Sequence, residues 1–331
     1  MSGPIRLAID AMGGDLGPRS VVPACVRALE KFPSLELTLF GDPAEISAEL
    51  HSSHHARLTL VECESHVTQE DAPAFALRHK RDSSMGCALQ ALADGRVDGM
   101  VSGGNTGALM ALSCHFVGKV NGVRRPAIGK SLPTETGSCF LLDLGANIGV
   151  CAEDLLQFAR MGVEAQKLYT DQRPLKVALL NIGSEAHKGT EEIRRAAELF
   201  REAPDIEYYG FIEGHDLFTG CVDVVVCDGM LGNIAMKSAE GVIRLMGQKV
   251  FRFDQKNAFK SFFGQMAIKL LRKWRSQLEP ARYNGASFLG LSGNVIKSHG
   301  GASSAAFFQA IVTAVHCAEA DLAGRVDRAL S

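Results

Sequence analysis

The chain has 331 residues, of which 46% are hydrophobic, and its 35 Lys and Arg nearly balance its 37 Asp and Glu. This near-neutral charge excludes a general attraction to nucleic acid, so an electrostatic partner must be bound by a local patch. No run of about 18 apolar residues is present, which argues against a membrane-spanning helix. The nine cysteines form no CxxC pair, so we expect reduced thiols in a cytoplasmic protein.

Short apolar runs alternate with helical patterns along the chain. The predicted strands are 6–9, 35–40, 57–61, 99–102, 139–143, 176–181, 207–210 and 222–227. The predicted helices are 20–31, 84–94, 106–118, 153–160, 191–200, 233–249 and 303–322. Continuous apolar strands such as VDVVV are typical of parallel strands covered on both faces. The pattern predicts an α/β fold, with a doubly wound, mostly parallel sheet in one domain over 1–331 and a helical protrusion at 250–280.

Glycines and small polar residues gather where the predicted strands end. After the strands at 6–9 and 99–102 these residues are Asp10, Gly13, Gly14, Asp15, Gly104, Asn105, Thr106 and Gly107. After the strands at 139–143, 176–181 and 222–227 they are Asp143, Asn147, Asn181, Gly183, Lys188, Gly189, Asp228, Gly232 and Asn233. Glycine lets backbone N–H groups turn toward a ligand, and helix N-termini attract anions. These turns predict one shared phosphate site at the carboxyl edge of the sheet.

The alternative for each single turn is that it only changes the direction of the chain, with Asn, Asp or Thr as helix N-caps. The sequence contains no GxG, GxxxxGK, GxSxG or HExxH motif. It therefore lacks the dinucleotide fingerprint, the P-loop, the nucleophile elbow and the zinc-protease helix. The histidine-rich HSSHH at 51–55 lies in a polar stretch, so we expect a solvated loop there and no metal site.

Six motifs together resemble the phosphate acyltransferases of bacterial phospholipid synthesis, the PlsX family. They are DAMGGDLGP, SGGNTGALM, LLDLGAN, ALLNIGSEAHKG, VVVCDGMLGNIAMKSAEG and YNGASFLGLSGNVIKSHG, in this order along nearly the whole chain. The stretch QEDAPAFALRHKRDSSM also fits the family pattern. One departure follows LDLGAN, where the family usually has an acid and this chain has Ile148, Gly149 and Val150.

The resemblance implies transfer of a long fatty acyl group from acyl carrier protein to inorganic phosphate. The product is an acyl phosphate, which a membrane acyltransferase uses to acylate glycerol 3-phosphate. The implied fold is a Rossmann-like three-layer α/β/α sandwich, and the implied enzyme is a homodimer without metal or organic cofactor, located in the cytoplasm at the inner face of the cell membrane. The alternatives are a phosphotransacetylase-like enzyme using acyl-CoA, a decarboxylating dehydrogenase, and a non-enzymatic membrane-surface scaffold.

Acyl transfer to phosphate needs no enzyme nucleophile, because phosphate itself attacks the thioester; the site must supply position and charge. Lys188 is the predicted phosphate cation, although a surface lysine is the alternative. Asn233 is predicted to polarise the thioester carbonyl or orient phosphate, unless it is only an N-cap. His299 is predicted to donate a proton or a hydrogen bond, with a purely structural loop histidine as the alternative. Cys227 is not needed as a nucleophile.

The segment 255–278 contains six basic residues and no acid. On a helix, one face carries Phe259, Phe262, Phe263, Met266, Leu270 and Trp274. This pattern predicts an interfacial helix that binds an anionic membrane surface. The alternative is a core-facing or dimer-forming helix, which Gly264 could split into a hairpin.

Overall fold

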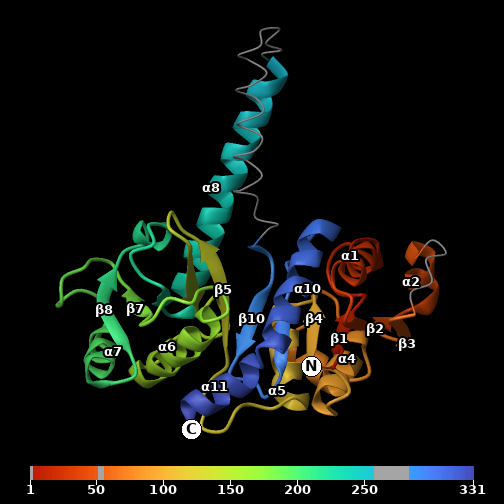
Figure 1. Cartoon of the computed structure of the whole chain (residues 1–331), viewed down its shortest axis with the longest axis horizontal. Helices are drawn as coiled ribbons and strands as arrows, with labels where there is room; N and C mark the ends of the chain where they lie inside the picture. The colour runs from red at the N-terminus through yellow and green to blue at the C-terminus, as the bar shows by residue number, and fades with distance from the viewer. Residues whose placement is uncertain (1–2, 51–55, 257–282) are drawn as a thin grey trace.

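The computed structural model describes residues 3–50, 56–256 and 283–331. In these residues eleven strands form a single sheet in the order β3-β2-β1-β4-β11-β10-β5-β6-β9-β7-β8 (Figure 1). The strands are β1 Ile5–Asp10, β2 Leu35–Gly41, β3 Leu58–Glu62, β4 Gly99–Ser102, β5 Ala127–Pro133, β6 Ser138–Leu142, β7 Lys176–Leu180, β8 Glu207–Ile212, β9 Val224–Val226, β10 Ala286–Leu289 and β11 Asn294–Lys297. All eight predicted strands are present, whereas β5, β10 and β11 were not predicted.

The sheet consists of two parallel blocks joined by an antiparallel centre. Strands β3, β2, β1, β4 and β11 run parallel to one another, and so do β6, β9, β7 and β8. The pairs β11–β10, β10–β5 and β5–β6 are antiparallel. The mostly parallel sheet expected from the apolar runs is confirmed.

Helices cover both faces of this sheet. They are α1 Pro18–Lys31, α2 Pro43–Leu50, α3 Pro73–His79, α4 Ser84–Ala93, α5 Thr106–Phe116, α6 Ala152–Gln166, α7 Glu191–Glu202, α8 Gly229–Lys256, α10 Ser304–Glu319, α11 Leu322–Leu330 and the short 3-10 helix η1 Asp216–Phe218. Helices α2, α3 and α11 had no counterpart in the sequence prediction.

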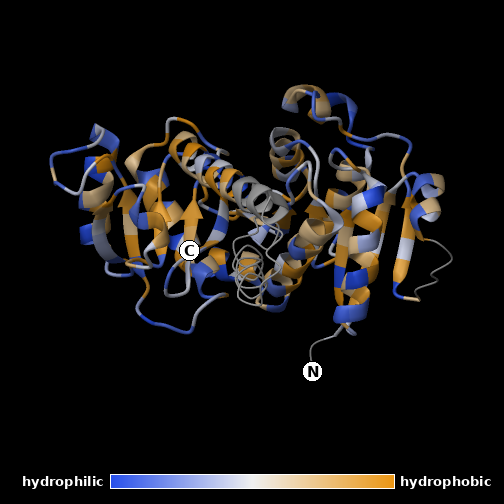
Figure 2. Cartoon of the chain, turned by 90° about the horizontal axis from the view of Figure 1, so that it is seen from above, coloured by the Kyte–Doolittle hydropathy of each residue, from blue (hydrophilic) through white to orange (hydrophobic). Residues whose placement is uncertain are grey.

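Alternate residues of each strand point to opposite faces and enter separate cores. On β6, Phe140 and Leu142 join the core beneath α1, α6, α7 and α10, whereas Cys139 and Leu141 join the core beneath α4 and α5. Figure 2 shows the apolar strands between the two helical layers. The three-layer α/β/α sandwich is thus confirmed.

Helix α8 projects away from the sheet (Figure 1). It begins four residues before the predicted helix at 233–249 and extends beyond it. The predicted membrane-facing residues, from Phe259 to Trp274, lie outside the described residues, as does the HSSHH stretch. Within the part that is described, no helix has the length and apolarity needed to cross a membrane.

Candidate active site

Strand β1 ends at Asp10, whose side chain is 1% exposed. Its carboxylate accepts hydrogen bonds from the hydroxyls of Ser84 and Ser102, each at 2.7 Å. Burial raises the pKa of Asp10, and these two hydrogen bonds oppose the shift. Asp10 is therefore a buried anchor that joins β1 to α4 and β4.

The glycine pair after β1 lies against other backbone segments. A Cβ atom on Gly13 would lie 2.8 Å from the backbone nitrogen of Gly104. Gly14 has a φ of 95°, and a Cβ atom there would lie 2.7 Å from the carbonyl oxygen of Gly300. The backbone N–H of Asp15 donates to that same oxygen at 2.9 Å. Glycine is required here because the loops after β1, β4 and β11 pack directly on one another.

The loop after β4 is held by Asn105, the N-cap of α5. Its Oδ1 accepts a hydrogen bond from the N–H of Ala108 at 3.0 Å, and its Nδ2 donates to the carbonyl of Gln69 at 2.8 Å. A Cβ atom on Gly107 would lie 2.8 Å from a proline ring of α3. These contacts leave Thr106 exposed at the start of α5. Asn105 thus acts as the cap that the alternative interpretation expects.

Asp143 organises the loop after β6 in the same way. Its Oδ1 accepts hydrogen bonds from the N–H groups of Ile128, Gly145 and Ala146, at 3.0, 3.2 and 3.1 Å. Its Oδ2 accepts from the backbone N–H and the Nδ2 of Asn147, at 2.7 and 2.9 Å. Burial raises the pKa of Asp143, and these donors oppose the shift. Asp143 and Asn147 therefore shape the loop from inside.

Asp228 ties this loop to the start of α8. Its carboxylate accepts hydrogen bonds from the N–H groups of Gly149 at 2.7 Å and Met230 at 2.8 Å. Gly149 has a φ of 69°, a conformation that strains any side chain. Glycine therefore suits position 149. Gly232 is equally constrained, because a Cβ atom would clash with the carbonyl oxygen of Asp143.

A cavity of about 560 Å³ opens where these loops meet. Four of the predicted site residues line it, namely Asp15, Thr106, Asn233 and His299. Three lysines from different elements also line it, namely Lys130 of β5, Lys237 of α8 and Lys297 of β11. We call this space the lysine cavity.

Lys297 is the half-buried cation at the end of β11. Its Nζ donates hydrogen bonds to the carbonyl oxygens of Gly103, at 3.3 Å, and Ser298. Burial lowers the pKa of Lys297 to about 8, although Asp10 and Asp15 oppose the shift. Lys297 therefore changes its charge close to neutral pH.

Lys130 and Lys237 share one acid, Glu240 of α8. The Nζ atoms lie 3.9 and 3.5 Å from its carboxylate oxygens. The Lys130 side chain is only 11% exposed, and burial lowers its pKa. With Asp15 as the second acid, the lining has three lysines against two carboxylates, so its charge is positive.

Lys237 also contacts His299, with 3.1 Å between Nζ and Nε2. An ammonium group can only donate, so Nε2 is the acceptor and the imidazole is neutral with its proton on Nδ1. Burial lowers the pKa of His299, and the charge of Lys237 lowers it further. His299 is thus held as a neutral hydrogen-bond donor.

The loop after β7 lies outside the lining of the lysine cavity. Nδ2 of Asn181 donates to the carbonyl oxygens of Gly183 at 3.2 Å and Lys188 at 3.1 Å. Gly189 has a φ of 91° and packs against Asn181. Nζ of Lys188 lies 2.9 Å from a carboxylate oxygen of Glu185. The predicted role of Lys188 stays a prediction, and its ammonium is paired in this conformation.

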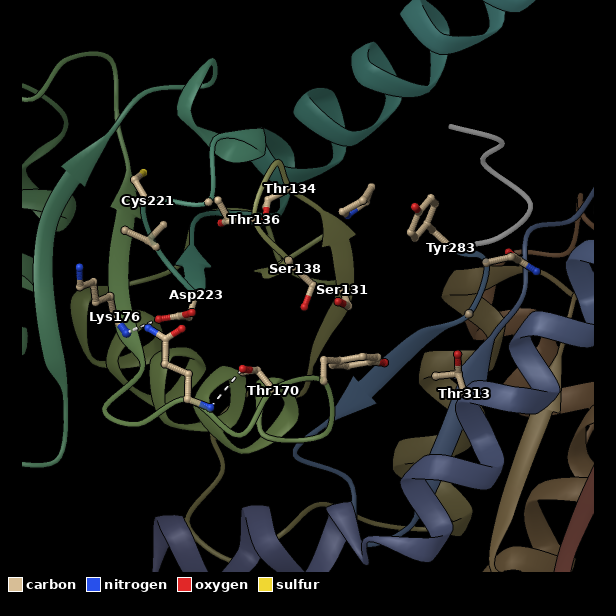
Figure 3. A pocket seen from close by; sticks show the side chains of 18 residues that line it. Ser131, Thr134, Thr136, Ser138, Thr170, Lys176, Cys221, Asp223, Tyr283 and Thr313 are labelled. Atoms are coloured by element: carbon tan, nitrogen blue, oxygen red, sulfur yellow. Dashed lines mark hydrogen bonds between the residues drawn. The ribbon is translucent and has the colours of Figure 1, made fainter. Parts of the chain in front are cut away.

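A second polar cavity of about 670 Å³ lies beside the opposite ends of β6, β7 and β9 (Figure 3). Its lining is rich in hydroxyl groups, which include Ser131, Thr134, Thr136, Ser138, Thr170 and Thr313. None of the predicted site residues lines it. We place the active site in the lysine cavity, because ligands of α/β sheets bind beyond the carboxyl ends of the strands.

Three lysines of this cavity were missed from sequence. Lys237 lies four residues after Asn233 and therefore on the same face of α8, a relationship that helical spacing could have revealed. Lys297 directly follows an apolar pair in NVIK, within a motif already noted for its glycines. Lys130 had no such signal, because its strand was not predicted.

Cys227 is fully buried, and burial raises the pKa of its thiol, as expected for a residue that is not a nucleophile.

The fold resembles the α/β fold of two solved phosphotransacylases. A phosphotransacetylase from Streptococcus pyogenes superposes with a TM-score of 0.64 at 18% identity, covering 96% of this chain and 94% of its own. A branched-chain phosphotransacylase from Enterococcus faecalis gives a TM-score of 0.59 at 17% identity, covering 95% and 99%. At these identities the likeness concerns the fold alone.

Sequence comparison identifies the family. Residues 5–325 match a family model described as "Fatty acid synthesis protein". A phosphate acyltransferase of Teredinibacter turnerae is 45% identical over 331 residues, covering 100% of both chains. One of Pseudomonas fluorescens is 48% identical over 312 residues, covering 93% of both. The chain belongs to the phosphate acyltransferase (PlsX) family of enzymes.

Proposed function

We propose that this enzyme transfers a long-chain acyl group from acyl carrier protein to inorganic phosphate in the lysine cavity. The observation that carries the proposal is the convergence of Lys130, Lys237 and Lys297 where the motif loops meet. Membership of the phosphate acyltransferase family supports the choice of phosphate as acceptor.

Phosphate binding follows from the charges of the cavity. Phosphate is an anion with several acceptor oxygens, and lysine ammonium groups supply both charge and donors. Lys130 and Lys297 are largely desolvated, so their attraction for an anion is screened less than at an open surface. The neutral Nδ1–H of His299 adds a donor without adding charge.

The reaction is one displacement at the thioester. A phosphate oxygen attacks the carbonyl carbon and forms the new C–O bond, and the C–S bond then breaks. The thiolate of the carrier's prosthetic arm leaves with the electron pair and takes up a proton. Lys297 can supply that proton because its pKa of about 8 is close to neutral. The side-chain amide of Asn233, exposed at the cavity, can donate to the carbonyl oxygen as negative charge develops there.

The product has a fatty chain and a charged head, so it must reach an enzyme that works at a membrane. We infer that a membrane acyltransferase uses it to acylate glycerol 3-phosphate. We also propose that the chain forms one domain and acts as a homodimer at the inner, anionic face of the cell membrane. The basic, acid-free segment 255–278 supports the membrane contact.

A donor comparison tests the proposal. The purified full-length chain is incubated with phosphate and either palmitoyl-acyl carrier protein or palmitoyl-CoA, and acyl phosphate is trapped with hydroxylamine. We expect acyl phosphate from the carrier-bound donor. Formation from acyl-CoA alone would favour the phosphotransacetylase alternative, and no product from either donor would favour a scaffold.

A further inference from the structure

We infer that a narrow apolar cavity beside the lysine cavity, between α8 and the β5–β6 pair, holds the acyl chain of the substrate. Its free volume is about 50 Å³, against about 560 Å³ for the lysine cavity. The two cavities share Lys130, Met236 and Glu240 in their linings. The inference rests on the proposed function, because it takes the substrate to be an acyl donor.

Strand β5 forms one wall of the apolar cavity. Its side chains on this face change from charged to apolar along the strand. Lys130 and Leu132 are two residues apart and therefore lie on one face of the sheet. Leu141 of β6 pairs directly with Lys130. Both leucines are buried and line the apolar cavity. A chain whose head is bound near Lys130 thus meets an apolar wall as soon as it leaves the lysine cavity.

Helix α8 forms the opposite wall with small side chains. Ala235, Ala239 and Ile243 recur at a spacing of four and face the sheet, half-buried. Because two of them are alanines, space remains between the helix and β5. Leu217 and Phe218 of η1 close the side of the cavity.

The polar boundary lies at the Lys130–Glu240 ion pair, with 3.9 Å between Nζ and Oε1. On one side of it are the lysines that attract phosphate, and on the other side the lining is almost entirely apolar. A fatty acyl thioester has the same division, with a reactive carbonyl at one end and a methylene chain beyond it. A narrow slot suits a single extended chain better than a branched or aromatic group.

Binding of two phosphonates tests the inference without requiring turnover. Decylphosphonate and butylphosphonate have the same head and differ by six methylenes, and each buried methylene changes an equilibrium constant by about fourfold. By calorimetry on the full chain, we expect decylphosphonate to bind at least ~100-fold more tightly than butylphosphonate. No preference for the longer chain would overturn the inference.

Ala239→Leu and Ala235→Leu place bulk inside the cavity, and leucine keeps a helix propensity close to that of alanine. We expect each to lose most of the decyl preference while the butylphosphonate affinity stays within about twofold. Ser238→Leu adds similar bulk on the exposed side of the same helix and should keep the preference. Thermal unfolding checks that all three variants are folded.

An unchanged preference in both alanine variants would place the chain elsewhere. A preference that Ser238→Leu also loses would point to a general effect on α8 and would contradict the inference as well. Failure of the proposed function has a different signature, because the wild-type chain would then prefer decylphosphonate but form no acyl phosphate.

Discussion

Nζ of Lys237 lies 3.1 Å from Nε2 of His299, and this contact joins the third turn of α8 to the loop after β11. These residues are 62 positions apart in sequence. The contact makes His299 an acceptor at Nε2 and leaves Nδ1–H as its only donor. We therefore expect His299 to bind phosphate through a hydrogen bond and not to supply the leaving group's proton.

Replacing His299 tests this assignment. We expect His299→Ala to lower kcat/KM by about 10- to 100-fold, the scale of one hydrogen bond to a charged group. His299→Asn keeps a neutral donor and should recover part of the loss. A loss in His299→Ala of more than about 1,000-fold, without recovery in His299→Asn, would fit a general acid instead.

The pH dependence of phosphate use reports Lys297. Its pKa is lowered to about 8, so its charge is present below that pH and is lost as the pH rises through it. We expect kcat/KM for phosphate to fall up to about tenfold per pH unit above 8, because kcat/KM reports the free enzyme. Lys297→Arg stays charged throughout this range and should be less sensitive. If kcat/KM depended on pH in the same way in the wild type and in Lys297→Arg, Lys297 would not be the titrating group.

The sequence predicts that Lys188 binds phosphate, whereas the structure places its ammonium beside Glu185, outside the lining of the lysine cavity. If Lys188 holds phosphate, Lys188→Ala should lower kcat/KM by about 100-fold. Because its ammonium is paired with Glu185 outside the lysine cavity, we expect a loss below about fivefold, the scale of an exposed ion pair. Glu185→Gln is the matched control, since it frees Lys188 without removing its charge. A large loss in Lys188→Ala alone would restore the sequence-based role.

The segment 255–278 predicts binding to membranes. We expect the chain to sediment with vesicles that contain anionic lipid and to be released by salt, because basic residues attract such headgroups at about 1 kcal/mol each. The double variant Phe262→Glu, Phe263→Glu should lose this binding and keep most of its activity on soluble substrates. Equal sedimentation of wild type and variant would reassign the segment to another contact, such as the dimer interface.

The sequence predicted the outer blocks of the sheet better than its centre. Strands such as β7 and β9 are apolar runs buried on both faces, so local pattern alone identifies them. Strand β5 reads AIGKSLP and breaks the pattern with Gly129, Lys130 and Ser131. Gly129 is required because a Cβ atom would clash with the ring of Phe140 on β6, a long-range cause that no local pattern contains.

The candidate site also depends on long-range contacts that a local sequence pattern does not contain. Turn chemistry drew attention to the loops, but it did not show which residues shape a loop and which face the cavity. Asp10 and Asp143 are buried and bonded to the protein, whereas Asp15 and Asn233 line the cavity. Lys130 could be assigned to the cavity only from the three-dimensional structure, in which β5 lies beside α8. Which side of a loop faces a ligand depends on tertiary packing.

Calorimetry at pH 7 on the wild-type chain and on Lys297→Ala measures whether the lysine cavity binds phosphate. We expect the wild type to bind inorganic phosphate and Lys297→Ala to bind it at least ~10-fold more weakly, the scale of a lost hydrogen bond to a charged group. Lys297→Arg should bind it with intermediate affinity. Equal affinity of wild type and Lys297→Ala would contradict the assignment of the lysine cavity as the phosphate site.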